Sequence, residues 1–499
     1  MTSGAPAGAH RTTLTIAPDA LPGHANTLLD NGYRVALIAG HDDGHQLRAV
    51  YLFTAGDPDR RVELHVPLDK TAPEIPSLAA LSFPAGRFER EMRDLYGIIP
   101  TGHPLPRRLV RHFHWPQGWY PMRADVGPPP LFGDVDGPYP FRTVEGPGVY
   151  EIPVGPVHAG VIGPGHFRFS VVGETILALK VRLWFVHRGI EKLFHGRTPQ
   201  SGIELAERVA GDTTVGHALA YCLAVEDALG TVVPADAQRL RAVLLELERL
   251  HNHIADIGAL CNDVGHGILN THALRVRERL LRLNDTVTGH RLLRGGVHLG
   301  GATVRALPDP AELAAIAGDV AEIVDIARSN TVVADRFTGT AILTATQARH
   351  IGALGYVARA SGLTVDARRD HPFLPGRYRA PELRHTDGDV LSRFLVRADE
   401  FAHSIALITE LAAALGDIRS TGASPGPPRK SGVGIAEGWR GTIVHRVELG
   451  QDGTLARVKI VDPSFPTWPA LPVALADTIV PDFPLANKSF NLSYPGNDL

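Results

Sequence analysis

The sequence predicts an α+β protein in which a small N-terminal α/β domain precedes a large, mainly helical domain with β segments at its periphery. Its 499 residues exceed the size at which one hydrophobic core keeps growing, so two or more domains are expected. Short strand-like runs fill residues 1–123, and long segments with apolar residues at helical spacing follow residue 204. A stretch rich in proline and glycine at 124–149 separates them. We therefore predict domains at 1–123 and 150–499, joined by this linker.

The N-terminal domain is predicted from alternating or continuous apolar runs that Gly, Asp and Pro interrupt. One helix is expected over residues 21–31. Strands are expected at 33–39, 47–53 and 61–67. A charged run at 88–98 would place Glu and Arg on one helix face, where each local pair contributes only about 0.2–0.5 kcal/mol. This mixture indicates a small α/β domain.

The second domain begins with predicted strands at 150–154 and 167–180. Long segments rich in Ala, Leu, Arg and Glu then carry apolar residues at helical spacing, at 204–229, 235–260, 271–291, 310–329 and 391–415. A loop rich in Gly and Pro is expected at 422–434. Strand-like alternation returns at 441–447 and 455–461. The pattern favours a helical core with β segments at its edge.

The charge balance of the chain leaves no broad basic surface. Fifty Lys and Arg residues stand against 53 Asp and Glu residues, a formal net charge of −3, whereas a nucleic-acid phosphate backbone needs a cationic face. We therefore expect no nucleic-acid partner. No secretory pattern stands at residues 1–16, and no apolar run reaches the ~20 residues that cross a bilayer. Any membrane association is expected to be peripheral, and low cysteine use suits the cytoplasm.

The segment Arg208-Val209-Ala210-Gly211-Asp212-Thr213 has the outline of a metal motif. It resembles the first motif of nickel-iron hydrogenase large subunits, in which an Arg-x-Cys-Gly-x-Cys run supplies two thiolates. Ala210 and Thr213 stand at the two cysteine positions, and the run 482–491, where the second Cys-x-x-Cys motif would lie, has no cysteine. The chain has only two cysteines, Cys222 and Cys261. Because such a centre takes four soft thiolate ligands, no metal site is predicted.

Two neighbouring runs near the end of the N-terminal domain carry a second resemblance. The run 88–98 precedes Gly102-His103-Pro104 and the basic pair Arg107-Arg108. Together they resemble the signature of the 30-kDa-type subunit of NADH-quinone oxidoreductase, the respiratory complex I. The resemblance implies a docking domain without a cofactor over residues 1–123. From the residues alone, the run 88–98 would be an ordinary charged helix face.

Three runs in the second domain follow the order and spacing of another component of that enzyme. They are Gly155-Pro156-Val157-His158, His166-Phe167-Arg168-Phe169 and Val186-His187-Arg188-Gly189-Ile190-Glu191-Lys192-Leu193. They resemble the 49-kDa-type subunit of complex I and the large subunits of the formate hydrogenlyase type, which belong to the group 4 nickel-iron hydrogenases. The match is colinear across nearly all of the chain from residue 150. It implies a fusion of a 30-kDa-type domain with a 49-kDa-type domain, the C/D-like arrangement of NADH-quinone oxidoreductase.

The resemblance also assigns residues to a site for a quinone-like acceptor. The family tyrosine that hydrogen-bonds the quinone headgroup maps onto Tyr221, whose hydroxyl can donate a proton, and the family aspartate maps onto Asp263. From the residues alone, Tyr221 could equally be packed in the core and Asp263 could equally be a turn residue. We predict the catalytic residues Tyr221, His158 and Asp263 and the cofactor-binding residues His217, His166 and Arg208.

One position departs from the family pattern. A second family histidine, four residues after the Gly-Pro-x-His histidine, falls on Ile162 if the loop aligns without gaps. Isoleucine can neither bond a quinone oxygen nor move a proton. The inherited quinone site would then work only if His158 or His166 replaced that histidine.

The expected function is that of the large peripheral-arm subunit of a membrane-associated respiratory oxidoreductase. Electrons would come from an iron-sulfur cluster on a small partner subunit of the complex I type, because this chain cannot ligate one, and would pass to a quinone. Antiporter-like membrane subunits and a membrane anchor of the complex I type are the other expected partners, at the cytoplasmic face of the membrane. No cofactor is expected on the chain itself.

Two alternatives remain open from the sequence. The chain could be a scaffold that holds partner subunits and performs no redox chemistry, which Ile162 favours. It could also be a hydrogen-evolving formate hydrogenlyase subunit, which the cysteine count disfavours. Binding of NAD by this chain is not expected, since no Gly-x-Gly-x-x-Gly fingerprint follows a strand.

Overall fold

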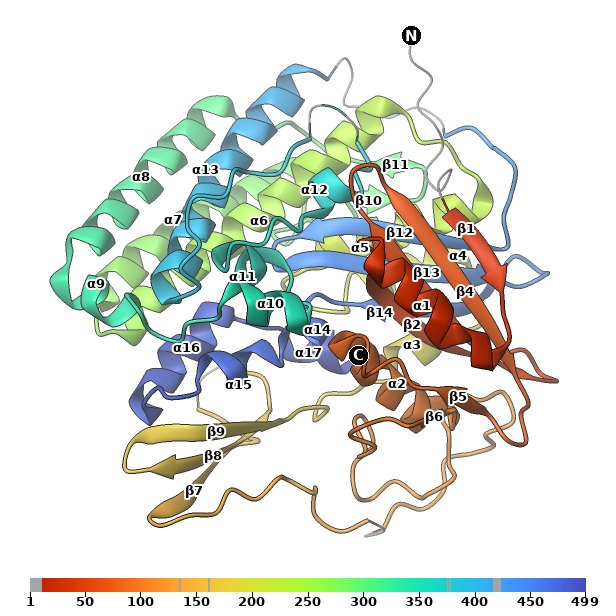
Figure 1. Ribbon diagram of the computed structural model, residues 1–499. Helices are drawn as coiled ribbons and strands as arrows, with labels where there is room; N and C mark the ends of the chain where they lie inside the picture. The colour runs from red at the N-terminus through yellow and green to blue at the C-terminus, as the bar shows by residue number, and fades with distance from the viewer. Residues whose placement is uncertain (1–10, 134–135, 160–161, 375, 377, 416–422) are drawn as a thin grey trace.

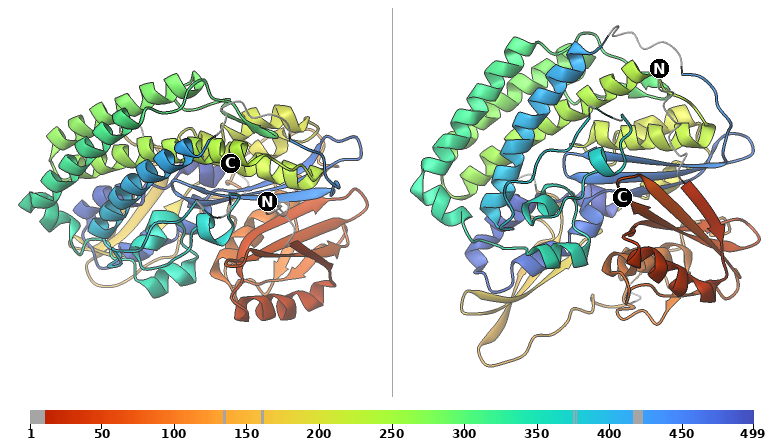
Figure 2. Two further views of the ribbon diagram at one scale, coloured as in Figure 1. Left: turned by 90° about the horizontal axis from the view of Figure 1, so that it is seen from above. Right: turned by 45° about the horizontal axis from the view of Figure 1, so that its top comes forward.

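The computed structural model describes residues 11–133, 136–159, 162–374, 376, 378–415 and 423–499. An N-terminal sheet domain packs beside a larger domain built on long helices (Figures 1 and 2). A three-stranded sheet from near the C-terminus lies between the helices and the N-terminal domain. This arrangement confirms the predicted α+β class.

The N-terminal domain is a four-stranded sheet with two helices. The strand order is β1-β4-β3-β2, with β1 parallel to β4 and the other neighbours antiparallel. Its elements are β1 (Arg11–Thr15), α1 (Leu21–Asp30), β2 (Arg34–Asp42), β3 (Leu47–Ala55), β4 (Arg60–Leu68), β5 (Glu74–Pro76), α2 (Phe83–Tyr96) and β6 (Ile99–Thr101). Helix α2 has Pro84 in its first turn and ends at Gly97, which takes the left-handed φ of 75°. The predicted helix and three strands are confirmed with small shifts of their ends.

Irregular chain joins the two domains and begins earlier than predicted. The described part of 102–148 contains no helix or strand. Its first half is tied to the sheet domain, because the Asp94 carboxylate accepts hydrogen bonds from the backbone N–H groups of Leu109 and Val110 at 2.6 and 2.9 Å. None of the described residues in 124–148 is buried, and Leu131 is 98% exposed. This later part is irregular chain with few packed side chains.

The second domain opens with an antiparallel sheet of β7 (Val149–Val154), β8 (His166–Val172) and β9 (Thr175–Arg182). The single strand predicted at 167–180 is therefore two strands, which turn at Gly173. The helices that follow are α3 (Ile190–Leu193), α4 (Pro199–Ala206), α5 (Thr214–Leu229), α6 (Ala235–Asp263), α7 (Gly267–Thr288), α8 (Pro310–Ser329), α9 (Thr331–Phe337), α10 (Ala345–Ile351), α11 (Gly355–Ala360), α12 (Ala367–Asp370) and α13 (Val390–Ala413). A short hairpin, β10 (Val297–His298) and β11 (Gly301–Ala302), follows α7.

Helix α6 is the centre of the helical core. Helices α5, α7 and α13 pack against it (Figure 1). The predictions for α6, α7, α8 and α13 are confirmed in type and approximate extent. The segment predicted as one helix at 204–229 divides into α4 and α5, with irregular chain between them. No helix in the described residues is long and apolar enough to cross a membrane.

The C-terminal part forms β12 (Ser431–Gly438), β13 (Gly441–Leu449), β14 (Leu455–Val461), α14 (Ser464–Thr467), α15 (Ala470–Ala474), α16 (Phe483–Phe490) and α17 (Tyr494–Asp498). Strand β12 corrects the last part of the loop prediction for 422–434, since Gly432 and Gly434 belong to a strand, whereas the described residues 423–430 are irregular as predicted. Helix α5 approaches β12 so closely that a Cβ on Gly432 or Gly434 would lie 2.0 or 1.9 Å from a carbonyl oxygen of that helix. Glycine is therefore required by the packing here and not by a turn.

The sheet β12-β13-β14 connects the helical core to the N-terminal domain. Because side chains alternate along a strand, His445 on β13 points to α5, where it meets His217, and Arg446 points to β4, where it pairs with Glu63 at 3.2 Å. The β14 residue Lys459 pairs with Glu91 of α2 at 2.7 Å. Buried ion pairs thus hold the N-terminal domain on this sheet.

A buried ionic network ties the helical core to the same sheet. Arg359 of α11 binds Glu400 of α13 at 2.6 Å, Asp366 at 3.0 Å and Glu437 of β12 at 2.8 Å. Arg249 of α6 continues the network through Glu246 and Glu400, at 2.9 and 3.6 Å. Arg368 closes it on Asp366 and Glu246, at 2.8 and 3.6 Å. All of these side chains are buried, so each charge depends on its partners.

We expect Arg359→Met to lower the free energy of unfolding by about 3–5 kcal/mol, because it leaves buried carboxylates without their counter-charge. Urea unfolding of the full chain measures the loss. Arg282→Met is the matched control: Arg282 makes an exposed pair with Glu278, and its loss should cost no more than about 0.5 kcal/mol. Equal effects of the two substitutions would contradict the importance of the network.

The network also predicts a loss of stability in acid. Burial opposes ionisation of Glu246, but Arg249, Arg368 and a hydrogen bond from Ser404 lower its pKa to about 2. A carboxylate with a lowered folded pKa stabilises the fold above its unfolded pKa and loses that effect as the pH falls towards the folded value. Stability should therefore fall between about pH 4.5 and 2, with Glu246 contributing on the order of 3 kcal/mol.

The Glu246→Gln variant isolates this contribution. Urea unfolding at a series of pH values should show a shallower decline for the variant than for the original chain over the same range. Parallel declines would show that Glu246 is not the titrating group.

Candidate functional site

The segment that resembles a metal motif, residues 208–213, is irregular chain between α4 and α5. Arg440, in the turn between β12 and β13, donates to both Asp212 carboxylate oxygens at 2.7 Å and to the backbone carbonyl of Asn491 at 2.6 Å. The two positions that would carry thiolates, Ala210 and Thr213, are buried. The Thr213 hydroxyl accepts a hydrogen bond from the Trp439 indole at 3.1 Å. A methyl group and an occupied hydroxyl do not fit the requirements of a nickel-iron centre.

Arg188 holds this segment against the C-terminal helix. Its guanidinium donates to the backbone carbonyls of Arg208 at 3.1 Å, Val209 at 2.7 Å and Pro495 at 3.4 Å. The ring of Tyr494, on the same C-terminal helix, lies so close to Gly163 and Gly165 that an added Cβ there would clash with it. Three separate segments, 155–166 in its described residues 155–159 and 162–166, 208–213 and 491–499, therefore meet, and we call this place the three-segment junction.

The junction presents apolar and cationic side chains to solvent. Val157 is 86% exposed and Ile162 is 46% exposed, and the side chain of Arg208 is half exposed. Val157 and Ile162 both belong to the connection between β7 and β8, and exposed large apolar side chains are typical of a surface that contacts another protein. The junction thus has the character of a docking edge.

Directly beneath the junction lies a buried chain of three titratable groups. His217 on α5 contacts Asp462 through Nε2 at 3.0 Å and His445 on β13 through Nδ1 at 3.1 Å. Asp462 also accepts a hydrogen bond from the Ser464 backbone at 2.8 Å and lies against Gly496 of α17. If His217 donates to Asp462, its other nitrogen must accept from His445. We call these three residues the histidine relay.

The pKa shifts of His445 and Asp462 describe a neutral imidazole at one end of the relay and a carboxylate at the other. Burial and the neighbouring His217 lower the pKa of His445 well below its usual range, so His445 is neutral. Burial opposes ionisation of Asp462, but the hydrogen bond from His217 and the nearby charge of Arg440 keep its pKa below the usual value. The Nδ1 atom of His445 is buried and has no partner among the described residues. The relay could therefore hold or pass a proton without exposure to solvent.

The structure places Tyr221 away from any exposed surface. Its ring lies one turn after His217 on α5 and 6.2 Å from the His445 ring. The hydroxyl, however, is buried and donates to the carbonyl of Pro199 at 2.7 Å. Burial raises the pKa of Tyr221 above its ordinary value. This geometry favours a core position and does not support the predicted role at a quinone.

His158 lies on the connection between β7 and β8, His166 is the first residue of β8, and both rings brace the connection. The His158 ring contacts the carbonyl of Gly165 at 2.8 Å, and the His166 ring contacts the carbonyl of Gly155 at 3.2 Å. Both rings are only partly buried. The predicted residues His158 and Arg208 thus belong to two different segments of the junction, and His166 stands at the end of the segment that carries His158.

Asp263 does not join them, contrary to the prediction of one shared cavity. It is the last residue of α6 and is exposed. Glu248, also on α6, accepts hydrogen bonds from the first turn of α5, and at 1.5 Å per residue about 22 Å of helix separates it from Asp263. Asp263 therefore lies far from the start of α5, where His217 and the junction are.

Comparison with known families agrees with the fold. Residues 14–130 match the profile of the respiratory-chain NADH dehydrogenase 30 Kd subunit, and residues 263–424 match that of its 49 Kd subunit. Residues 188–261, which include the 208–213 segment, match the nickel-dependent hydrogenase profile. The three profiles follow one another along the chain in the order that a fusion requires.

Curated relatives match at about the same level of identity. Formate hydrogenlyase subunit 5 of Escherichia coli is 32% identical over 97% of this chain and 88% of its own length. The carbon monoxide-induced hydrogenase of Rhodospirillum rubrum is 31% identical over 68% of this chain and 97% of its own length. The C/D subunit of NADH-quinone oxidoreductase from Phocaeicola vulgatus is 30% identical over 69% of this chain and 70% of its own length.

A solved structure supports the same fold. A chain in the structure of the membrane-bound sulfane sulfur reductase, an archaeal respiratory membrane complex, superposes with a TM-score of 0.63 at 24% identity, over 70% of this chain and 98% of that chain. The chain therefore belongs to the family of fused subunits that join domains like the 30 Kd and 49 Kd subunits of respiratory NADH dehydrogenase, together with formate hydrogenlyase subunit 5 and the C/D subunit of NADH-quinone oxidoreductase.

Proposed function

We propose that the chain is the large peripheral subunit of a membrane-associated respiratory oxidoreductase and that it takes part in electron transfer from a partner's iron-sulfur cluster to a quinone-like acceptor. The observation that carries the proposal is the three-segment junction. It gathers the segments that resemble the hydrogenase and 49-kDa-type motifs into one edge with exposed apolar side chains. The names of the relatives, all oxidoreductase components, support the same class.

The chain's own residues would supply protons and position the acceptor. A quinone takes up protons when it is reduced, so groups that can donate them must lie nearby. His158 is the partly exposed imidazole at the junction, and the histidine relay lies beneath it. Arg208 offers an exposed cation for a quinone oxygen that gains charge. Tyr221 and Asp263 do not enter this proposal, because one is sealed in the core and the other lies at the far end of α6.

A small iron-sulfur subunit of the complex I type is the partner that would cover the junction. Antiporter-like membrane subunits and a membrane anchor of the complex I type would hold the assembly at the cytoplasmic face of the membrane. The exposed Val157 and Ile162 are the side chains that such a small subunit would bury. No cofactor would be ligated by this chain itself.

The positions and burial of the two thiols disfavour hydrogen chemistry at a nickel-iron centre. Cys222 and Cys261 are buried in α5 and α6 and lie outside the 208–213 segment. Burial raises the pKa of Cys261 to about 12, which opposes the thiolate form that binds metal. The chain therefore lacks the thiolate ligands that a nickel-iron centre for formate hydrogenlyase activity would need. Stoichiometric nickel in the purified assembly would refute this conclusion.

A non-catalytic scaffold is the second candidate function. Two features favour it: Ile162 stands where the family histidine falls if the loop aligns without gaps, and the Tyr221 hydroxyl donates to the carbonyl of Pro199. A scaffold would keep the junction for docking and leave the histidine relay as a structural element. Quinone-dependent oxidation of the partner's clusters distinguishes the two functions.

We expect His158→Gln to slow oxidation of the clusters by quinone by roughly 10²-fold, since general acid catalysis contributes at least that much. The native complex, purified through a tag on one of its other subunits, is reduced with dithionite and freed of excess reductant. A soluble quinone is then added, and cluster oxidation is followed by electron paramagnetic resonance.

His195→Gln is the matched control, because the exposed His195 ring also contacts a backbone carbonyl, that of Ala456 at 3.0 Å. This control should leave the rate unchanged. Clusters that quinone cannot oxidise in the original complex would support the scaffold and contradict electron transfer.

Tyr221→Phe is expected to change stability and not the oxidation rate. Loss of the hydroxyl leaves the buried carbonyl of Pro199 without its donor, which should lower the free energy of unfolding by about 1–3 kcal/mol. Thermal unfolding of the full chain measures this effect, and the cluster assay measures the rate. A large fall in the rate with unchanged stability would restore Tyr221 to the quinone site.

A further inference from the structure

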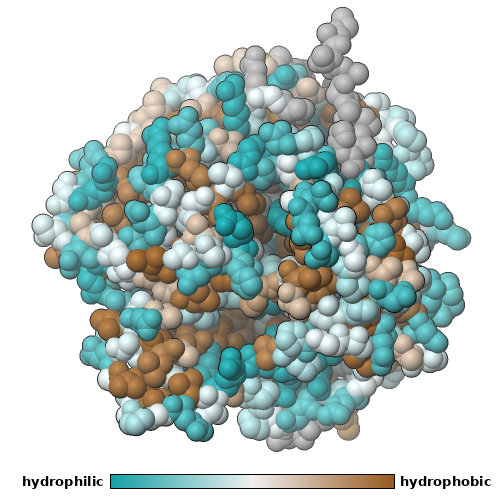
Figure 3. Space-filling view, in the orientation of Figure 1, coloured by the Kyte–Doolittle hydropathy of each residue, from teal (hydrophilic) through white to brown (hydrophobic). Residues whose placement is uncertain are grey.

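A deep cavity lies between the N-terminal domain and the β7-β8-β9 sheet, outside the junction. Its volume is about 550 Å³, and it is bounded by α2, the chain around 103–107, the chain at 139–144, β9 and the residues 468–472. Figure 3 shows the molecular surface hollowed between the α2 side and the β9 side. None of the predicted catalytic or cofactor-binding residues lines it.

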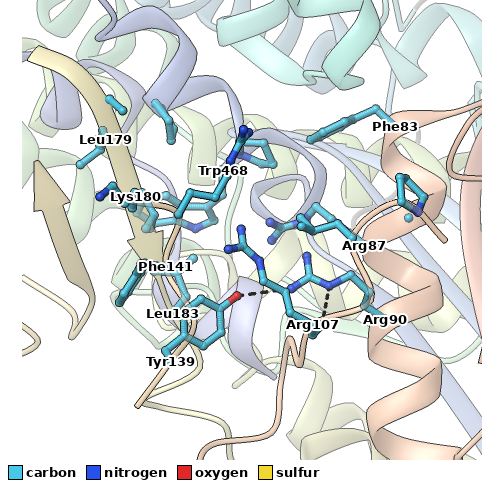
Figure 4. A pocket seen from close by; sticks show the side chains of 18 of the residues that line it. Phe83, Arg87, Arg90, Arg107, Tyr139, Phe141, Leu179, Lys180, Leu183 and Trp468 are labelled. Carbon is cyan, nitrogen blue, oxygen red and sulfur yellow. Dashed lines mark hydrogen bonds between the residues drawn. The ribbon is translucent and has the colours of Figure 1, made fainter. Parts of the chain in front are cut away.

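One wall of the cavity is strongly cationic. Arg87 and Arg90 project from α2, and Arg107 comes from the following chain (Figure 4). No aspartate or glutamate is among the lining residues, all of which belong to the described part of the chain. This local excess of positive charge contrasts with the rest of the protein, where most buried arginines pair with carboxylates.

The three guanidinium groups bind only neutral acceptors. Arg90 donates to the carbonyls of Arg107 and Arg108 at 2.9 and 3.0 Å, and Arg107 donates to the carbonyl of Pro140 at 3.1 Å. Arg87 donates to the side-chain oxygen of Asn497 at 3.1 Å. Such bonds fix the side chains in place but leave their charges without a counter-ion.

Two donors in this wall are unused. The Nε atoms of Arg87 and Arg107 are buried and have no hydrogen-bond partner among the described residues. Burial and the nearby charge of Arg90 lower the pKa of Arg87 to about 9, so it remains protonated at neutral pH. A bound anion would relieve the repulsion between these charges.

The opposite wall is apolar. This wall is lined by Leu179 and Val181 of β9 and by Leu183, the residue that follows the strand. The aromatic rings of Phe141 and Trp468 complete it (Figure 4). Lys180 also belongs to β9, but its ammonium group pairs with Glu151 of β7, in the same sheet. The cavity therefore offers charge on one side and a hydrophobic surface on the other.

We propose that this cavity is a binding site for a small organic phosphate with an apolar or aromatic body. The phosphate group would bind Arg87, Arg90 and Arg107, whose planar donor arrays match phosphate oxygens. The body of the ligand would lie against β9 and Trp468. The volume suits a small-molecule ligand, and the site is independent of the electron-transfer function proposed above.

The test uses 1-naphthyl phosphate as the probe, titrated into the full chain by calorimetry. We expect it to bind at least about tenfold more tightly than either inorganic phosphate or 1-naphthol, because only the complete probe reaches both walls. Equal affinity for inorganic phosphate, equal affinity for 1-naphthol or no binding of the probe would overturn the proposal.

Single substitutions then locate the site. Arg87→Gln and Arg107→Gln should each lower the affinity for the probe about tenfold. Arg107→Lys, which keeps the charge, should lower that affinity less. Arg282→Gln, on the exposed face of α7, is the control and should have no effect. Arg107 lies on irregular chain and is only partly buried, so its variants should fold, which circular dichroism checks. Unchanged affinity in both Gln variants would refute the assignment.

Discussion

The buried ionic network around Arg359 is the constraint on which the rest of the structure depends. A charge taken out of water is tolerated only where opposite charges and hydrogen bonds meet it, so Glu400, Asp366 and Glu437 fix α13, α12 and β12 relative to α11. Once β12 is placed, its sheet receives α5 on one face and the N-terminal domain on the other. The junction and the histidine relay both take their positions from that sheet.

The helices were predictable because their signal is local. Helix α8 has its predicted bounds, since Asp309 caps its first turn and apolar residues follow at helical spacing. Strand β12 was missed for a physical reason: Gly432 and Gly434 suggest a loop, yet close packing of α5 is what requires them. A sequence pattern records the glycine but not the neighbour that makes it necessary.

The site was predicted only in part. The resemblance named His158, Arg208 and His217 as site residues, but the partners of His217 are 245 and 228 residues away in the sequence, at Asp462 and His445. No local pattern reveals contacts over such separations. Tyr221 lies one turn after His217 on α5, but its hydroxyl donates to the carbonyl of Pro199, a contact that the sequence does not reveal. A residue can therefore match a family position while its reactive group is already hydrogen-bonded in the core.

The covalent connection between the domains contributes little to their association. The described part of 124–148 has no buried residue, whereas the contacts of Arg446 with Glu63 and of Lys459 with Glu91 are enclosed. Cleavage of the chain at the exposed Leu131 would leave those contacts intact. Two polypeptides encoded by separate genes could form the same interface, so fusion changes the effective concentration of the halves and not the way they recognise each other.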